Sequence, residues 1–263
     1  MTTSAPGVST NFGRLILVPN TLDLGNEAVP IQQVLPLGVL QQAARLAHWV
    51  AEDARSTRAY LKRVHAVQPL ALPLQAIDIR ELPRPHKGMR GAQAIDVREL
   101  DALLAPALAG QDLGLISEAG LPAVADPGAA LVSAAHARSI AVLPLAGASS
   151  LLLALAASGL NGQSFAFVGY LPQDAGERQG LIRELEGVSR RLGQTQLLIE
   201  TPYRNAAMLK ALVDALRPDT RVSVSCGLSL PEGWVRTDKV SAWRQKPAQM
   251  PDRTPAVFAF LAN

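Results

Sequence analysis

The chain has 263 residues, of which 48% are hydrophobic and 18% are charged. This composition allows a large buried core, excludes an intrinsically disordered protein, and fits one large domain or two smaller ones. The formal net charge is only +3, but nine basic and three acidic residues lie between Ala54 and Arg98. Such a local excess is typical of proteins that bind phosphate groups, although a solvated helix face is the alternative.

The first part of the chain alternates between strand and helix patterns. Short apolar runs predict strands at 13–19, 48–51, 113–117 and 140–144, and another strand within 70–79. Helical spacing predicts helices at 31–42, 56–64, 97–108, 128–137 and 149–159, with Asp126 capping the fourth and Ser149 capping the fifth. This alternation predicts a parallel sheet with helices on both faces, and a basic loop is expected at 80–91.

The second part of the chain has a different pattern. Strands are predicted at 165–168, 195–199, 222–225 and 257–261, and helices at 173–192 and 206–216. A short polar link with glycines lies near residues 161–164. We therefore expect a tail at 1–12 that is disordered, an N-terminal α/β domain at 13–162, and a C-terminal α/β domain with a mixed sheet at 163–263.

Several classes of site and location are disfavoured. The single cysteine, Cys226, excludes an internal disulfide, and four scattered histidines lack the spacing of metal ligands, so we expect no metal. The first residues lack the regions of a secretory signal, which favours a cytoplasmic protein. The uncharged stretch at 139–173 is broken by Pro144 and by the small residues at 147–150, so we expect no membrane span there.

The familiar nucleotide-binding motifs are missing. The sequence contains neither G-x-G-x-x-G nor G-x-x-x-x-G-K-[ST], so a dinucleotide-binding Rossmann domain and a P-loop lack support. Glu118 begins a segment similar to the E-x-G-x-G turn of Rossmann-type methyltransferases, but Pro122 stands where the second glycine should be. No G-x-S-x-G elbow is present, which disfavours a hydrolase.

Motifs in chain order resemble the tetrapyrrole methylase superfamily, the S-adenosylmethionine-dependent methyltransferases of the non-Rossmann, two-domain type. Residues 51–58 read A-E-D-A-R-S-T-R, similar to A-E-D-T-R-x-T-R, and residues 116–122 read I-S-E-A-G-L-P, similar to V-S-D-A-G-T-P. Residues 144–150 read P-L-A-G-A-S-S, similar to P-I-P-G-P-S-A, and residues 200–204 read E-T-P-Y-R, similar to E-S-P-H-R. Within the superfamily, the resemblance is closest to the ribosomal RNA small-subunit methyltransferase I family.

The resemblance implies two α/β domains with the cofactor in a cleft between them, and S-adenosylmethionine as that cofactor. It also implies a homodimer that acts on ribosomal RNA of the small subunit, where it methylates the ribose 2′-hydroxyl of a cytidine. Carried over residue by residue, the cofactor contacts are Leu22, Glu118, Leu121, Ser149, Ser150, Pro255 and Ala256. The alternative for each of these residues is an ordinary turn or cap.

The resemblance also suggests residues for the substrate and for proton transfer. Arg55, Arg58 and Arg204 suit phosphate or ribose contacts, with Glu200 beside them, although ion pairs with Glu52 or Glu200 would serve structure alone. Because a 2′-hydroxyl must lose its proton, a positioned base helps the reaction. Asp53 and Glu118 are the candidate bases.

The chain departs from the family pattern at several positions. Glu118 replaces an aspartate, Leu121 replaces a threonine, and residues 226–230 replace A-R-E-L-T-K. The pattern ends at Asn263, without the further C-terminal segment of many members. Two alternatives therefore stay open: a methylase of a tetrapyrrole or another small molecule, and a cofactor-binding protein with little catalysis.

Overall fold

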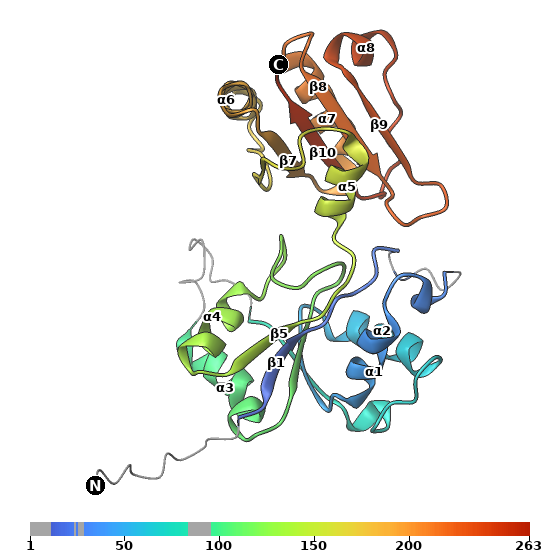
Figure 1. Ribbon diagram of the computed structural model, residues 1–263, viewed down its shortest axis with the longest axis vertical. Coiled ribbons are helices and arrows are strands. Elements are labelled where there is room, and N and C mark those ends of the chain that lie inside the picture. The colour runs from blue at the N-terminus through green and yellow to red at the C-terminus, as the bar shows by residue number, and fades with distance from the viewer. Residues whose placement is uncertain (1–11, 24, 26–28, 84–95) are drawn as a thin grey trace, which may run out of the picture. The chain divides into compact units, whose positions relative to one another are not determined.

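The structure, a computed structural model, describes residues 12–23, 25, 29–83 and 96–263. Residues 1–11 of the expected tail and 84–91 of the expected basic loop lie outside the described residues. The chain divides into two compact units, Met1–Ala148 and Ser149–Asn263 (Figure 1). Each unit has its own sheet.

The first unit contains a five-stranded sheet, sheet A, in the order β3-β2-β4-β1-β5, in which every neighbouring pair is parallel. Its strands are β1 (Arg14–Leu17), β2 (His48–Ala51), β3 (Asp78–Glu81), β4 (Leu113–Ile116) and β5 (Ala141–Pro144). Its α-helices are α1 (Leu37–Arg45), α2 (Ala54–His65), α3 (Val97–Leu108) and α4 (Ala129–Ala137), with short 3-10 turns η1 (Ile31–Gln33) and η2 (Leu74–Ala76). The predicted parallel sheet is confirmed.

Helices cover both faces of this sheet, α1 and α2 on one and α3 and α4 on the other (Figure 1). Alternate strand residues point to opposite faces: Ile16 and Trp49 pack with α1 and α2, whereas Leu15 and Val50 pack with α3 and α4. Burial on both faces explains why β1, β2 and β4, the inner strands, are mostly apolar, whereas the edge strand β3 carries Asp78, Arg80 and Glu81.

The second unit contains a five-stranded sheet, sheet B, in the order β6-β7-β10-β8-β9. It is mixed, as predicted. The pair β6 and β7 is parallel and the other neighbours are antiparallel. The strands are β6 (Phe165–Phe167), β7 (Thr195–Ile199), β8 (Arg221–Cys226), β9 (Trp234–Lys239) and β10 (Ala256–Leu261). The helices are α5 (Ser150–Ser158), α6 (Ala175–Leu192), α7 (Asn205–Ala215) and α8 (Val240–Gln245), with a 3-10 turn η4 (Pro202–Arg204).

Helix α5 lies in the second unit, whereas we predicted a boundary near residues 161–164. Ala154 and Leu155 of α5 pack against Leu197, Val257 and Ala259 of sheet B, on the face opposite the core that holds residues of α6, α7 and α8. This apolar contact accounts for a division between Ala148 and Ser149. The glycine at 159 ends α5 in the left-handed region, with φ of 64°.

Three local predictions were wrong. The strand expected within 70–79 is a 3-10 turn, η2, followed by β3 at Asp78–Glu81, which takes up the first two residues of the expected basic loop. The helix expected at 31–42 is a 3-10 turn followed by α1, because Pro36 disfavours helical geometry in the residue before it and starts a new helix after it. Asp126 does not cap α4, which begins at Ala129 after Gly128. Ala123 and Ala125 both adopt positive φ, and these turns delay the helix. Ser149 occupies the cap position of α5, but its side chain makes no capping hydrogen bond.

Candidate functional site

The carboxyl ends of the parallel strands gather the predicted residues of the first unit at one edge of sheet A. Two turns dominate this edge: the β1 turn, residues 18–23, and the β4 turn, residues 117–121. The Asn20 amide Nδ2 donates to the carbonyl oxygens of Ser117 and Glu118, each at 3.0 Å, and the Asn20 backbone N–H donates to the Gly120 carbonyl at 2.8 Å. The two turns are therefore held side by side.

Apolar contacts bring three loops of this edge together. Gly120 has a φ of +67°, and a Cβ built there would lie 3.4 Å from Cδ2 of Leu22. A Cβ on Gly147, after β5, would lie 2.2 Å from the Cβ of Pro19, so only glycine permits this approach. Leu22 is buried and Leu121 is half-buried, and both lie at the edge to which we assigned them.

Four carboxylates lie along the same edge. Glu52 Oε2 accepts a hydrogen bond from the Glu118 backbone N–H at 3.0 Å. Burial and the carboxylates of Glu52 and Asp53 raise the pKa of Glu118 above its ordinary value. Burial and the Glu52 carboxylate also raise the pKa of Asp126, to about 6. An edge this rich in acids favours a cationic ligand.

Asp53 also has a structural role. Its Oδ1 accepts the backbone N–H of Ser56 at 2.6 Å and so caps α2. This hydrogen bond lowers the pKa of Asp53. Glu118, by contrast, has no side-chain hydrogen bond among the described residues, so of the two candidate bases its carboxylate is the one left free.

Helix α2 carries the two predicted arginines of the first unit. Arg55 and Arg58 are exposed, and the only hydrogen bond of the Arg58 guanidinium within the described part of the chain goes to the Ala54 carbonyl of its own helix. Neither forms the ion pair with Glu52 that was the alternative interpretation, because no such contact is present among the described residues. Both guanidinium groups are therefore accessible from solvent.

The remaining predicted residues lie in the second unit. Arg204 and Glu200 form an ion pair at 3.2 Å, the structural interpretation that we had kept for them, and the Thr201 N–H also donates to Glu200 at 2.8 Å. Ser149 and Ser150 begin α5. Pro255 is exposed and its carbonyl accepts from the Gly227 N–H at 2.9 Å, and Ala256 is buried in β10.

Sequence reasoning missed three polar residues of the carboxyl edge. Asn20 joins the two turns, Arg63 of α2 binds Asp23 of the β1 turn at 2.7 Å, and Asp126 faces the other acids. Asn20 and Arg63 lie in no recognisable motif, and Asp126 was assigned to a helix cap instead. The one local indication is that three polar residues, Asn20, Thr21 and Asp23, directly follow the first predicted strand.

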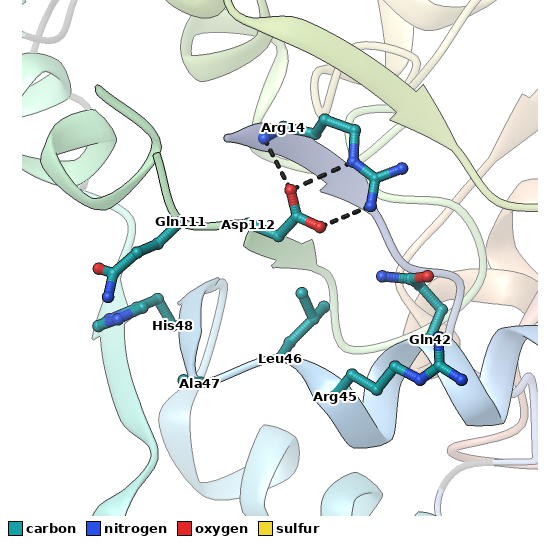
Figure 2. Close-up of a pocket in the computed structure, with 8 residues that line it drawn as sticks. All are labelled: Arg14, Gln42, Arg45, Leu46, Ala47, His48, Gln111 and Asp112. Atoms are coloured by element: carbon teal, nitrogen blue, oxygen red, sulfur yellow. Dashed lines mark hydrogen bonds and ion pairs between the residues drawn. The ribbon is translucent and has the colours of Figure 1, made fainter. Parts of the chain in front are cut away.

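A pocket of about 340 Å³ opens at the other end of sheet A, away from the predicted residues. It is lined by Gln42, Arg45, His48 and Gln111, and by Arg14 and Asp112, which are joined by hydrogen bonds (Figure 2). In open α/β sheets ligands collect at the carboxyl ends of strands, whereas this pocket lies at the amino ends of β1, β2 and β4. We therefore place the candidate site at the carboxyl edge.

The described part of the chain contains no group of three or more His, Cys, Asp or Glu residues arranged to hold a metal ion. In the same residues, no helix is both long enough and apolar enough to span a bilayer.

Comparison with known proteins finds relatives that carry the name Ribosomal RNA small subunit methyltransferase I. The chain is 37% identical over 140 residues to the Ribosomal RNA small subunit methyltransferase I of Mesorhizobium japonicum, with 53% of this chain and 46% of that protein covered. The proteins of the same name are 38% identical over 123 residues in Synechocystis sp. and 37% identical over 165 residues in Halalkalibacterium halodurans. These two matches cover 47% and 63% of this chain, and 43% and 48% of the relatives. No family model matches the chain.

Solved structures share the fold over nearly the whole chain. The methyltransferase CobJ superposes with a TM-score of 0.57 at 16% identity, covering 95% of this chain and 100% of that one. Uroporphyrin-III C-methyltransferase from Thermus thermophilus, complexed with S-adenyl homocysteine, gives 0.53 at 19% identity, covering 95% and 97%. The chain therefore has the fold of the tetrapyrrole methyltransferases and, over about half its length, is similar in sequence to the proteins named Ribosomal RNA small subunit methyltransferase I.

Proposed function

We propose that the chain is an S-adenosylmethionine-dependent methyltransferase that acts on ribosomal RNA of the small subunit, at the ribose 2′-oxygen of a cytidine. The chain spans about half the length of the curated relatives it matches, at 46% and 43% of the first two. The observation that carries the proposal is the carboxyl edge of sheet A, where Leu22, Glu118 and Leu121 lie on two joined turns. The predicted homodimer and cytoplasmic location remain part of the proposal.

The residues at this edge fit such a cofactor. S-adenosylmethionine carries a positive sulfonium, and the Glu52 carboxylate lies close enough to raise the pKa of both Glu118 and Asp126. Bringing a cation to this edge would relieve that repulsion. Leu22, packed over Gly120, offers an apolar surface for the adenosyl group. On the other unit, we propose that Ser149, Ser150, Pro255 and Ala256 complete the contacts.

The bound cofactor would supply a methyl group activated by the sulfonium, so the protein mainly has to align the acceptor oxygen and exclude water. A ribose hydroxyl must also lose its proton. Glu118 suits this role because its carboxylate is free of hydrogen bonds within the described residues and its pKa is raised towards neutrality. Asp53 is the less suited base because its Oδ1 caps α2.

The exposed face of α2 suits an RNA backbone. Arg55, Arg58 and Lys62 lie on this face, and the helix contains no acidic residue. A helix rises about 1.5 Å per residue, so these cations are spaced about 4.5 and 6 Å apart along its axis. That spacing is close to the separation of successive phosphates in RNA. Arg204 and Glu200 would contact substrate from the second unit.

Calorimetry with S-adenosylmethionine tests the cofactor, and mass mapping tests the substrate. We expect saturable binding, and one 2′-O-methylcytidine in small-subunit RNA taken from a strain that lacks the gene and then incubated with protein and cofactor. Glu118→Gln should bind RNA normally but lower the turnover number about 100-fold. Absence of binding at millimolar cofactor would overturn the proposal.

Two other results would favour the alternatives. Binding of the cofactor with an unchanged RNA methylation map and no salt-sensitive affinity for RNA would favour a methylase of a small molecule. Binding without transfer to any acceptor, and with Glu118→Gln equal to the unsubstituted protein, would favour a cofactor-binding protein.

A further inference from the structure

The β1 turn is buried, and several side-chain hydrogen bonds hold it in place. Thr21, Leu22 and Asp23 are 3%, 9% and 0% exposed, although two of the three are polar. Burying a polar group costs free energy unless the group is hydrogen-bonded. The buried conformation of this turn therefore depends on hydrogen bonds to its polar groups.

Asn20 makes one set of these contacts. Its two amide hydrogens go to the carbonyls of Ser117 and Glu118, and its Oδ1 accepts the Thr21 backbone N–H at 2.8 Å. Its own N–H goes to the Gly120 carbonyl. Asn20 is 7% exposed, so this side chain joins the two turns through contacts that water does not share.

Arg63 makes the other set. From α2 its guanidinium reaches both carboxylate oxygens of Asp23, at 3.1 and 2.7 Å, and also Thr21 Oγ1 at 3.2 Å and the Val29 carbonyl at 3.0 Å. Burial alone would raise the pKa of Asp23, but the hydrogen bonds from Arg63 and Thr21 outweigh it and hold the pKa below its ordinary value. The Thr21 hydroxyl donates to Asp23 Oδ1 at 2.6 Å, which closes the network.

We infer that Asn20 and the Asp23–Arg63 pair form a clamp: they are positioning residues that hold Leu22 against Gly120 in the geometry the cofactor binds. The inference rests on the proposed function, because it assigns Leu22 and the β4 turn to the cofactor. Without these bonds the turn can sample other conformations, and the binding-competent fraction falls. These residues touch the turn rather than the reacting groups, so their loss weakens cofactor binding more than it slows transfer at saturation.

Asn20→Asp and Arg63→Lys test the inference. The first keeps the shape but replaces two N–H donors with a carboxylate facing two carbonyls, and the second keeps the charge but loses the fork that spans Asp23. We expect each to raise the Kd for S-adenosylmethionine about tenfold or more, with kcat at saturating cofactor within about threefold of the unsubstituted protein. Gln111→Glu and Arg138→Lys are the matched controls. Gln111 is exposed at the other edge of sheet A, and Arg138 pairs with Asp101 between α4 and α3.

Hydrogen exchange separates this inference from the proposed function. The backbone N–H groups of Asn20, Thr21 and Gly25, which donate within the network, should exchange faster in both variants and at the usual rate in the controls. Faster exchange with an unchanged Kd would overturn the positioning role, and unchanged exchange would overturn the clamp itself. If the unsubstituted protein binds no cofactor, the proposed function fails, and the role of the clamp in cofactor binding fails with it. The hydrogen-exchange rates of the two variants still show whether the clamp holds the β1 turn.

Discussion

Asp126 makes the stability of the folded chain depend on pH. Burial and the Glu52 carboxylate raise its pKa from 3.8 to about 6. The folded chain therefore keeps a proton that the unfolded chain has released, and the stability contributed by this group is complete below pH 3.8 and lost as the pH rises through about 6. Glu118 faces Asp126 as well and adds to the shift, while the Ser117 hydroxyl opposes it.

Asp126→Asn should remove this loss. We expect the variant to gain stability relative to the unsubstituted protein between about pH 4 and pH 6, and to keep a constant advantage above about pH 7. Urea midpoints measured across that range check the sign. Asp252→Asn, at an exposed aspartate of the second unit, is the control and should run parallel to the unsubstituted protein. A similarly parallel curve for Asp126→Asn would contradict the prediction.

At single residues, the sequence predicted part of the site. Leu22, Asp53 and Glu118 were assigned from the family resemblance, and the structure has them at one edge of sheet A. Asn20 and Arg63 were not found, because what makes them important is their partners: Ser117 is 97 positions from Asn20, and Asp23 is 40 positions from Arg63. Contacts between such distant positions leave no local pattern for sequence reasoning to read.

At the scale of helices and strands, hydrophobic periodicity predicted the elements that have a buried apolar face. Most strands of both sheets and most of the helices that cover them were predicted, because buried apolar runs repeat at the strand or helix period. Strand β9 and helix α8 were missed. Among the residues that the structure describes, β9 is an edge strand that pairs only with β8, and its residues Trp234–Lys239 are mostly polar and half-exposed. A strand with one covered side needs fewer apolar residues, so its signal is weak.

Helix α6 offers a test of stability at this scale, through one buried acid. Glu186 is 5% exposed, and its Oε1 accepts the Arg217 backbone N–H at 2.9 Å and the hydroxyl of Thr220, which ties α6 to the turn before β8. Glu186→Ala leaves both donors without a partner, so we expect a loss of about 2–3 kcal/mol in the free energy of unfolding. Glu184→Ala, exposed on the same helix, should change it by less than about 0.5 kcal/mol. Urea denaturation of both variants measures the free energy of unfolding. Equal losses in the two variants would contradict the prediction that the buried hydrogen bonds of Glu186 stabilise the fold.

At the scale of the whole molecule, the fold is shared more widely than the sequence. Structures below 20% identity superpose over 95% of the chain, whereas sequence similarity to the curated relatives covers about half of it. Core positions accept many apolar residues of the right size, so a fold persists while the sequence diverges. Substrate choice therefore has to come from surface groups, and the charge distribution is the feature to test.

The net charge of +3 hides the distribution that RNA would encounter. Arg55, Arg58 and Lys62 lie together on α2, so replacing all three with Gln removes a local field as well as three charges. If each neutralises one phosphate of a single-stranded segment, the slope of log affinity against log salt should become shallower by about 2. Replacing the exposed cations Arg183, Arg191 and Lys246 of the second unit with Gln lowers the net charge equally and should leave the slope within about 0.5 of the unsubstituted protein. Filter binding of small-subunit RNA fragments over a range of salt gives both slopes. Equal changes in the two triple variants would show that RNA senses the total charge and not the α2 face.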